Sequence, residues 1–265
     1  MSFLDKQHTV AQPNFNRWLV PPAALAIHLS IGMAYGFSVF WLPLSKAIGI
    51  TVAAPSDWKI KTLGWTYTLF FVLLGSSAAI FGGWLERNGP RKAGVAAACC
   101  WGGGFMVAAL GVYLHQIWLL WLGAGVIGGC GLGLGYISPV STLIKWFPDK
   151  RGMATGMAIM GFGGGAMIGA PLADKLMKFY ATPTSVGVWE TFVTMGLIYF
   201  VAMMCGAFTY RIPPAGWRPH GWSGPVSKVN AMMTQGHVHV NTVHRTPQFW
   251  MLWVVLCMNV SAGIG

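Results

Sequence analysis

The sequence contains very few charged residues. Asp, Glu, Lys and Arg make up only 9% of its 265 residues, and six residues in all are acidic. A soluble domain carries about 25% charged residues, so this composition excludes an ordinary soluble domain and a disordered chain. Hydrophobic residues account for 55% of the sequence and the mean hydropathy is +0.57. The composition therefore predicts an integral membrane protein.

The sequence also lacks a cysteine framework. Its five cysteines all lie inside apolar runs and none forms a Cys-x-x-Cys pair: Cys99, Cys100, Cys130, Cys205 and Cys257. This pattern excludes a disulfide scaffold and a thiol metal motif. The interpretation that remains is that they are small residues in helix packing.

Several site chemistries are missing as well. The net charge is +11, but the basic residues are scattered between apolar runs without a basic stripe, so we expect no nucleic-acid partner. The cluster of His237, His239 and His244 has no neighbouring carboxylate or thiol, which argues against a metal site. The glycine runs are not followed by Lys-Ser or Lys-Thr, so they are not phosphate loops. No Ser, His and Asp share a recognisable spacing, so we expect neither a cofactor nor an enzyme.

Six apolar runs are long enough to cross a bilayer, because a helix needs roughly 20 residues to do so. They predict an all-α bundle within residues 19–210, preceded by an N-terminal segment 1–18 and followed by a polar linker 211–248. A seventh run, 249–265, has no flanking charge at its end and reads as a truncated helix of a longer protein. The six runs are 19–44, 62–85, 93–114, 117–144, 152–173 and 191–210.

The lysines and arginines predict the orientation. Twelve of them flank one side of the spans, including those of the loops 86–92, 145–151 and 211–248, and five flank the other. The positive-inside rule then places the N-terminus and these loops in the cytoplasm. Short loops and no targeting segment are typical of a multi-pass protein of a bacterial inner membrane.

An internal repeat links the first and fourth spans. Gly32-Met-Ala-Tyr35 is echoed by Gly133-Leu-Gly-Tyr136. Because three spans is an odd number, the second copy would be inverted in the membrane, and inverted three-span repeats are typical of secondary transporters.

The loop after the second span carries a motif. It reads Gly82-Gly-Trp-Leu-Glu86-Arg87-Asn-Gly89-Pro-Arg91-Lys92 and resembles the loop motif of the major facilitator superfamily, with Glu86 in place of the commoner Asp. A carboxylate at a helix end can bind a basic group reversibly. The resemblance implies a gating loop of Gly82, Glu86, Arg87, Gly89, Arg91 and Lys92; the alternative is a positive loop that only sets the topology.

The stretch from Gly131 to Gly165, with Tyr136-Ile-Ser138-Pro139, Asp149-Lys-Arg-Gly152 and Gly161-Phe-Gly-Gly-Gly165, resembles spans four and five of the oxalate/formate antiporter family. Pro213-Pro-Ala-Gly216-Trp217 resembles that family's linker. The resemblance implies the six-helix N-terminal half of a twelve-helix major facilitator fold, with a missing C-terminal half as its partner and small carboxylate anions as substrates.

Two glycine stripes run at i, i+4 spacing, which lets helix backbones approach closely. A rocking transporter and a rigid bundle would both use them. They are Gly125, Gly129 and Gly133 on the fourth span, and Gly161, Gly165 and Gly169 on the fifth.

Polar and aromatic residues near mid-span are the candidates for binding substrate: His28, Tyr35, Tyr67, Tyr136, Ser138 and Met160. In the resembled family, aromatic residues box a small carboxylate, and Tyr35 and Tyr136 match those positions. The alternatives are helix packing for the tyrosines and a core hydrogen-bond role for His28. No Asp, Glu, Lys or Arg lies within the six apolar runs, so a cation for a dianion would come from the missing half.

The sequence thus favours a carboxylate antiporter that works by alternating access. A proton-coupled monocarboxylate symporter, a membrane enzyme and a non-transporting helix-bundle subunit are the alternatives.

Overall fold

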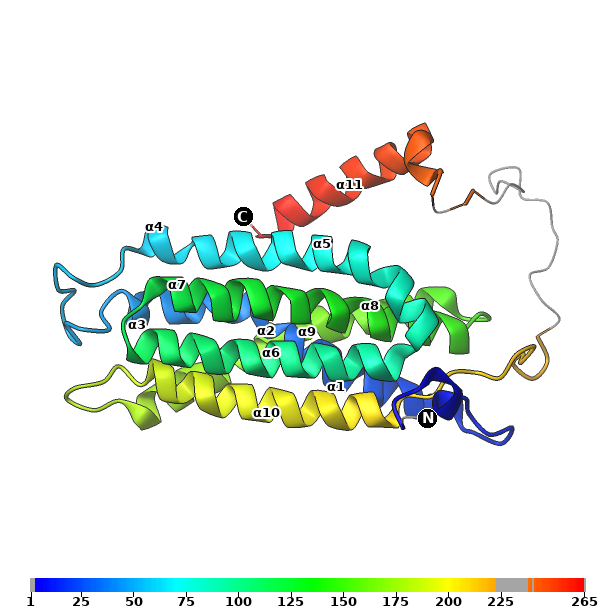
Figure 1. Cartoon of the computed structure of the whole chain (residues 1–265), viewed down its shortest axis with the longest axis horizontal. Helices are drawn as coiled ribbons and strands as arrows, with labels where there is room; N and C mark the ends of the chain where they lie inside the picture. The colour runs from blue at the N-terminus through cyan, green and yellow to red at the C-terminus, as the bar shows by residue number, and fades with distance from the viewer. Residues whose placement is uncertain (1–2, 223–237, 240, 265) are drawn as a thin grey trace. The chain divides into compact units, whose positions relative to one another are not determined.

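The computed structural model describes residues 3–222, 238–239 and 241–264 (Figure 1). The chain divides into two units, 1–222 and 223–265, which are described separately. The described part of the second unit contains a short 3₁₀ turn, Val243–Arg245, and the helix α11, Pro247–Ile264. His237 and the other residues of 223–237, together with residue 240, lie outside the described part of the predicted linker.

The first unit is the predicted bundle. Within the described residues, six helical spans of 22 to 30 residues are long and apolar enough to cross a membrane. The prediction of six spans is therefore confirmed. The spans are Arg17–Leu44 (α1 to α3), Ile60–Asn88 (α4 and α5), Pro90–Tyr113 (α6), Ile117–Trp146 (α7, the π-helical η4 and α8), Arg151–Tyr180 (α9) and Val188–Thr209 (α10).

One span is longer than its apolar run. The run was predicted to end at residue 173, but α9 continues to Tyr180 and includes charged residues in its last two turns. Lys178 Nζ lies 2.7 Å from Asp174 Oδ2, four positions earlier, so the pair stabilises the helix where it leaves the apolar layer. Pro171 lies within α9 and does not end it.

The helices pack in the way that an inverted repeat requires. The first span packs on the fifth and the fourth on the second, and the third packs on the sixth. If spans one to three are exchanged with spans four to six, the contact of the first span with the fifth becomes the contact of the fourth with the second. The contact of the third span with the sixth becomes itself. A Cβ at Gly32 would overlap Phe162 O and lie 2.9 Å from Gly165 Cα. A Cβ at Gly133 would likewise overlap Ser77 Oγ and lie 2.6 Å from Leu74 O. The repeat predicted from the Gly-x-x-Tyr echo is therefore present in the backbone contacts.

The first span is not one continuous helix. The helix α1, Val20–Ile31, ends at Gly32. The short helix α2, Met33–Gly36, a 3₁₀ turn η3, Phe37–Phe40, and α3, Trp41–Leu44, follow it. Interrupted spans are where transporters commonly place polar backbone groups for a ligand. Tyr35 lies inside this interruption.

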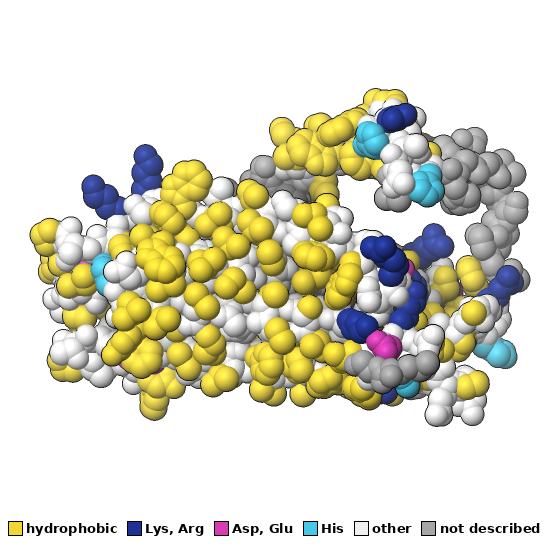
Figure 2. Space-filling view, viewed as in Figure 1, with side chains coloured by type: hydrophobic (Ala, Val, Ile, Leu, Met, Phe, Trp, Pro, Cys, Tyr) yellow, Lys and Arg dark blue, Asp and Glu magenta, His cyan; other side chains and the backbone are white. Residues whose placement is uncertain are grey.

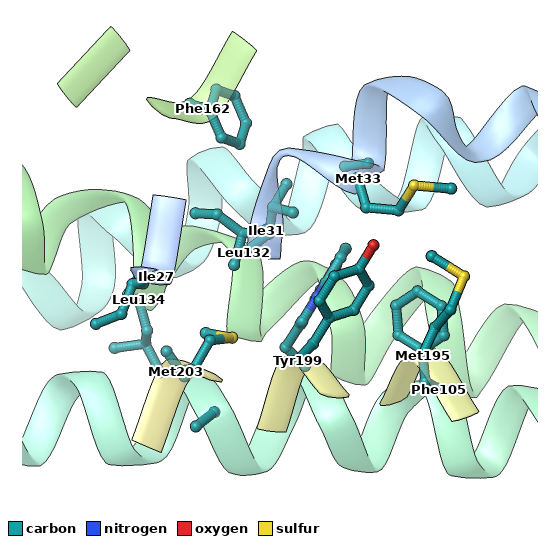
Figure 3. Close-up of a cluster of buried hydrophobic side chains, with 14 of the residues drawn as sticks. Ile27, Ile31, Met33, Phe105, Leu132, Leu134, Phe162, Met195, Tyr199 and Met203 are labelled. Atoms are coloured by element: carbon teal, nitrogen blue, oxygen red, sulfur yellow. The ribbon is translucent and has the colours of Figure 1, made fainter. Parts of the chain in front are cut away.

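The core fills the space between the spans. Figure 3 shows one layer of it, in which Met33 of α2 and Tyr199 of α10 point toward one another beside Phe105 and Met195. The face that Figure 2 shows is largely hydrophobic along the helices, and most of its Lys and Arg lie at the end that holds the N-terminus. We call this end the N-terminal rim; the ends of α5, α8 and α10 and the starts of α6 and α9 lie there.

Candidate functional site

The candidate site is an aromatic cluster halfway along the bundle. Its centre is Phe162 of α9, whose ring centroid lies 5.0 Å from that of Tyr35 and 5.2 Å from that of Tyr136. Phe71 of α5 lies 6.0 Å from Tyr35 and 5.8 Å from Tyr67. Four different spans therefore contribute rings to one cluster, and the two repeat-related tyrosines face the same phenylalanine.

The hydroxyl groups of these tyrosines differ in their contacts. Tyr67 donates a hydrogen bond of 3.0 Å to the carbonyl of Tyr35, which lies just before the 3₁₀ turn. Tyr35 and Tyr136 are half-buried, and within the described residues their hydroxyls form no hydrogen bond. The site thus holds two repeat-related hydroxyl donors among apolar rings, an arrangement that can bind oxygen atoms of a small anion.

His28 of α1 is fully buried beside the cluster. Its Nδ1 lies 2.7 Å from Ala158 O and its Nε2 3.2 Å from Tyr136 O. The ring also stacks on Tyr136 with centroids 5.7 Å apart. Because both nitrogens face backbone carbonyls of α9 and α8, His28 joins three spans behind the rings.

The two remaining candidates lie apart from the rings. Ser138 of α8 is fully buried, and Met160 of α9 is 62% exposed. The structure therefore brings together Tyr35, Tyr67, Tyr136 and His28, and leaves Ser138 in the core and Met160 on the surface.

The glycine stripes lie at helix crossings. Gly125, Gly129 and Gly133 face Leu69, Leu73 and Ser77 of α5, and Gly161, Gly165 and Gly169 face α1 and α2. A Cβ at Gly125 or Gly129 would stand 2.8 or 2.7 Å from a leucine Cβ. At each crossing there is room for the hydrogen atom of glycine but not for a Cβ.

At the end of α5, Glu86 contacts two side chains of α8 and Gly89 forms a turn. Glu86 accepts hydrogen bonds from Lys145 Nζ, at 2.7 and 2.9 Å, and from Ser141 Oγ at 2.7 Å, so it joins α5 to α8 across the N-terminal rim. Gly89 has φ +93°, a conformation that L side chains rarely adopt. This glycine makes the sharp turn that sends the chain into α6.

The basic residues of the loop hold the N-terminal segment. Arg91 is fully buried; its guanidinium donates to Phe3 O at 2.8 Å and to Tyr210 O at 3.3 Å, and lies 4.4 Å from the Phe3 ring centroid. Lys92 pairs with Asp5 at 2.7 Å. Arg87 is exposed and, among the described residues, donates only to Gly83 O of its own helix; a Cβ at Gly82 would meet open space there. The motif residues therefore have separate structural roles.

A second ion pair lies at the same rim. Arg17, at the start of the first span, donates from Nη1 and Nη2 to the two carboxylate oxygens of Asp149 at 2.7 and 3.0 Å. The two side chains are only 19% and 15% exposed. The Arg17 guanidinium also lies 4.8 Å from the Phe147 ring centroid. The pair fixes the loop between α8 and α9 to the first span.

We expect Asp149→Asn to lower the stability of the bundle at neutral pH but not at acid pH. The hydrogen bonds from Arg17 lower the pKa of the Asp149 carboxyl, so the pair stabilises the fold above the unfolded pKa, about 4. That contribution disappears as the pH falls through the still lower folded pKa. Thermal unfolding in detergent should show a loss of about 2 kcal/mol at pH 7.

The exposed pair on α9 provides the control. Asp174→Asn removes a pair whose side chains are 46% and 75% exposed and should cost less than about 0.5 kcal/mol. A loss for Asp149→Asn that stays constant down to pH 3 would contradict the assignment to this ion pair.

Sequence reasoning missed four components of the site. Phe162 and Phe71 look like ordinary core residues in an apolar run, and only their position opposite the repeated tyrosines could have singled them out. Lys145 was counted for the orientation alone, although its i, i+4 spacing from Ser141 places both on one helical face. The docking of residues 3–16 on the rim has no local signal.

The sequence matches one family model and is similar to several known proteins. The family model described as Major Facilitator Superfamily matches residues 23–264. A protein of Escherichia coli described as an uncharacterized MFS-type transporter, YhjX, is 25% identical over 94% of this chain and 55% of its own length. The oxalate:formate antiporter of Oxalobacter formigenes is 28% identical over 90% and 51%, respectively. Human monocarboxylate transporter 11 is 24% identical over 75% and 37%. The chain spans about half the length of the first two relatives.

Proposed function

Because the chain belongs to the major facilitator superfamily, whose members are transporters, we propose that it forms the N-terminal half of an antiporter for small carboxylates. The observation that carries the proposal is the pair of half-buried tyrosines, Tyr35 and Tyr136, at repeat-related positions on either side of Phe162. The similarity to a named oxalate:formate antiporter supports the substrate class.

In this proposal the tyrosines orient the substrate and the other half neutralises it. Each hydroxyl donates to a carboxylate oxygen, while the rings of Phe71 and Phe162 exclude water around the anion. A hydroxyl is a neutral donor, so a dianion also needs a cation, and the described residues offer none in the cluster. The C-terminal half then provides the cation, and alternating access follows from rocking of the two halves.

In this proposal the contacts of Glu86 with Lys145 and Ser141 at the N-terminal rim act as the gate of the transporter. We place the N-terminal rim in the cytoplasm of a bacterial inner membrane, as the excess of Lys and Arg predicts. Glu86 and Lys145 are 53% and 37% exposed, so their bond is weak enough to break and re-form during a transport cycle.

The test is exchange of labelled oxalate by the full-length transporter in proteoliposomes. Antiport predicts uptake only into vesicles loaded with formate or oxalate, with no effect of an imposed pH gradient. Tyr35→Phe and Tyr136→Phe should each raise KM about tenfold, because each removes a hydrogen bond to a charged group. Tyr113→Phe, at a 65% exposed ring, should leave KM unchanged.

The second candidate is a proton-coupled monocarboxylate symporter, favoured by the similarity to a monocarboxylate transporter. Uptake of a monocarboxylate into empty vesicles, driven by an inward proton gradient, would establish it in place of the antiporter. No uptake under either condition would contradict both candidates.

A further inference from the structure

Three cavities that share lining residues follow one another along α1, beside α10 and, in the last of them, also beside α9; together we call them the groove. A cavity of about 430 Å³ at the N-terminal rim and one of about 490 Å³ below it share Phe15 and Arg211 in their walls. A third, of about 220 Å³, shares Ala26 with the second. At the floor of the groove the helix backbones touch, because a Cβ at Gly206 would lie 2.7 Å from Ala23 O.

The groove has the length of one membrane leaflet. Its walls extend from Phe15 to Ser30. The helical part of this stretch, a 3₁₀ turn over Arg17–Leu19 followed by α1 from Val20, is about 20 Å long at rises of about 2.0 and 1.5 Å per residue. Half a bilayer with its headgroups measures roughly 20–22 Å. The groove therefore reaches from the level of the headgroups to the middle of the bilayer.

The chemistry of the groove changes along this length. The lower two cavities are lined almost entirely by apolar groups, among them Ala26, Leu29 and Ile198. The cavity at the rim is lined by His8, Gln12 and Asn14 together with Arg211, and no Asp or Glu lines any of the three. A molecule that fits is apolar for most of its length and anionic at one end.

Arg211 is positioned to bind the anionic end. It lies two residues beyond Thr209, where α10 ends. Its Nη1 donates to the carbonyls of Phe208 and Tyr210 at 3.1 and 2.9 Å, which fixes the guanidinium. Within the described residues Nε and Nη2 donate no hydrogen bond, and Arg211 forms no ion pair. A guanidinium with two free donors binds a phosphate in the bidentate manner.

We propose that this groove binds a phospholipid of the leaflet at the N-terminal rim, with its phosphate on Arg211 and an acyl chain between α1 and α10. The lipid joins the start of the first span to the end of the sixth. An anionic headgroup is preferred because Arg211 is the charged group of the site.

The test counts lipids retained by the full chain in native mass spectrometry, after purification from nanodiscs of phosphatidylcholine and phosphatidylglycerol. Arg211→Gln should reduce retained phosphatidylglycerol about tenfold, and Ala26→Phe, which fills the groove, should reduce both lipids. Arg218→Gln and Leu110→Phe are the matched controls, at an exposed arginine and at an outward-facing residue of α6 that lines none of the three cavities, and should change nothing.

Three results would overturn the proposal. Equal retention in all variants would indicate a non-specific lipid annulus. Displacement by inorganic phosphate, with no effect of Ala26→Phe, would indicate a site for a soluble anion. Protection of Cys205, an exposed residue of the groove wall, from maleimide in lipid-free protein would indicate that a protein segment covers the groove.

Discussion

Replacing Gly165 by valine is expected to prevent the bundle from folding. Gly165 stands where α9 crosses the first span, and a Cβ there would overlap Leu29 O and lie 2.6 Å from Gly32 Cα. Both obstacles are backbone, which cannot rotate away as a side chain can. Overpacking typically costs 1–3 kcal/mol, and a clash with main chain on two sides places this variant at about 4 kcal/mol or more.

Gly163 provides a closely matched control. It lies two residues earlier on the same helix, is exposed, and a Cβ there meets nothing within 4 Å. Gly163→Val should therefore change the stability by less than about 0.5 kcal/mol. The measurement is the yield of monodisperse protein in detergent and its thermal unfolding. Equal losses for the two variants would show that the fifth span is sensitive to any side chain, and would contradict the specific crossing at Gly32.

The sequence predicts the spans because their length is set by the membrane. A run of about 20 apolar residues has few other places to fold, so the six spans can be located from hydropathy alone. The repeat is equally readable, because a crossing without room for a Cβ requires glycine at both equivalent positions, Gly32 and Gly133. These features depend on composition and spacing, which the sequence contains directly.

The rotation of each helix about its axis is harder to predict. That Ser138 and Met160 contact the substrate stays a prediction; in the structure one is fully buried and the other is 62% exposed, a difference that the sequence does not signal. Spans that are apolar on all sides have no polar face to mark the outside, so hydrophobic periodicity gives no direction. α8 continues through Pro139 without a break. The interruption lies instead at Gly32 and Phe37–Phe40, where contacts with the second and fifth spans compensate for it.

Long-range partners are the second class of feature that the sequence does not reveal. The motif 82–92 presents Arg87, Arg91 and Lys92 as similar charges in one loop. Their environments differ because the chain returns to this loop twice, with residues 3–6 and with Tyr210. Separations of 88 and 119 positions leave no local pattern, so one motif predicted one role for residues that have several.

Arg91→Ala is accordingly expected to have a large effect and Arg87→Ala almost none. Arg91 is fully buried, and its removal leaves the carbonyls of Phe3 and Tyr210 without their charged donor and the Phe3 ring without its cation. Hydrogen bonds from charged groups are worth about 1.5–3 kcal/mol, so the loss of unfolding free energy should be about 3 kcal/mol. Arg87 is exposed and, in the described part of the chain, bonds only within α5, so the loss on its removal should stay below about 0.5 kcal/mol.

A second variant and a second measurement identify the cause of the destabilisation by Arg91→Ala. Arg91→Lys keeps the charge but cannot reach both carbonyls with a planar fork, so it should recover less than half of the lost stability. Hydrogen exchange of residues 3–16 should accelerate in Arg91→Ala and remain slow in Arg87→Ala, because Arg91 is the buried group that holds this segment to α6 and α10. If Arg87→Ala were as destabilising as Arg91→Ala, the basic residues would act as one charged patch, and the separate roles derived from their contacts would be wrong.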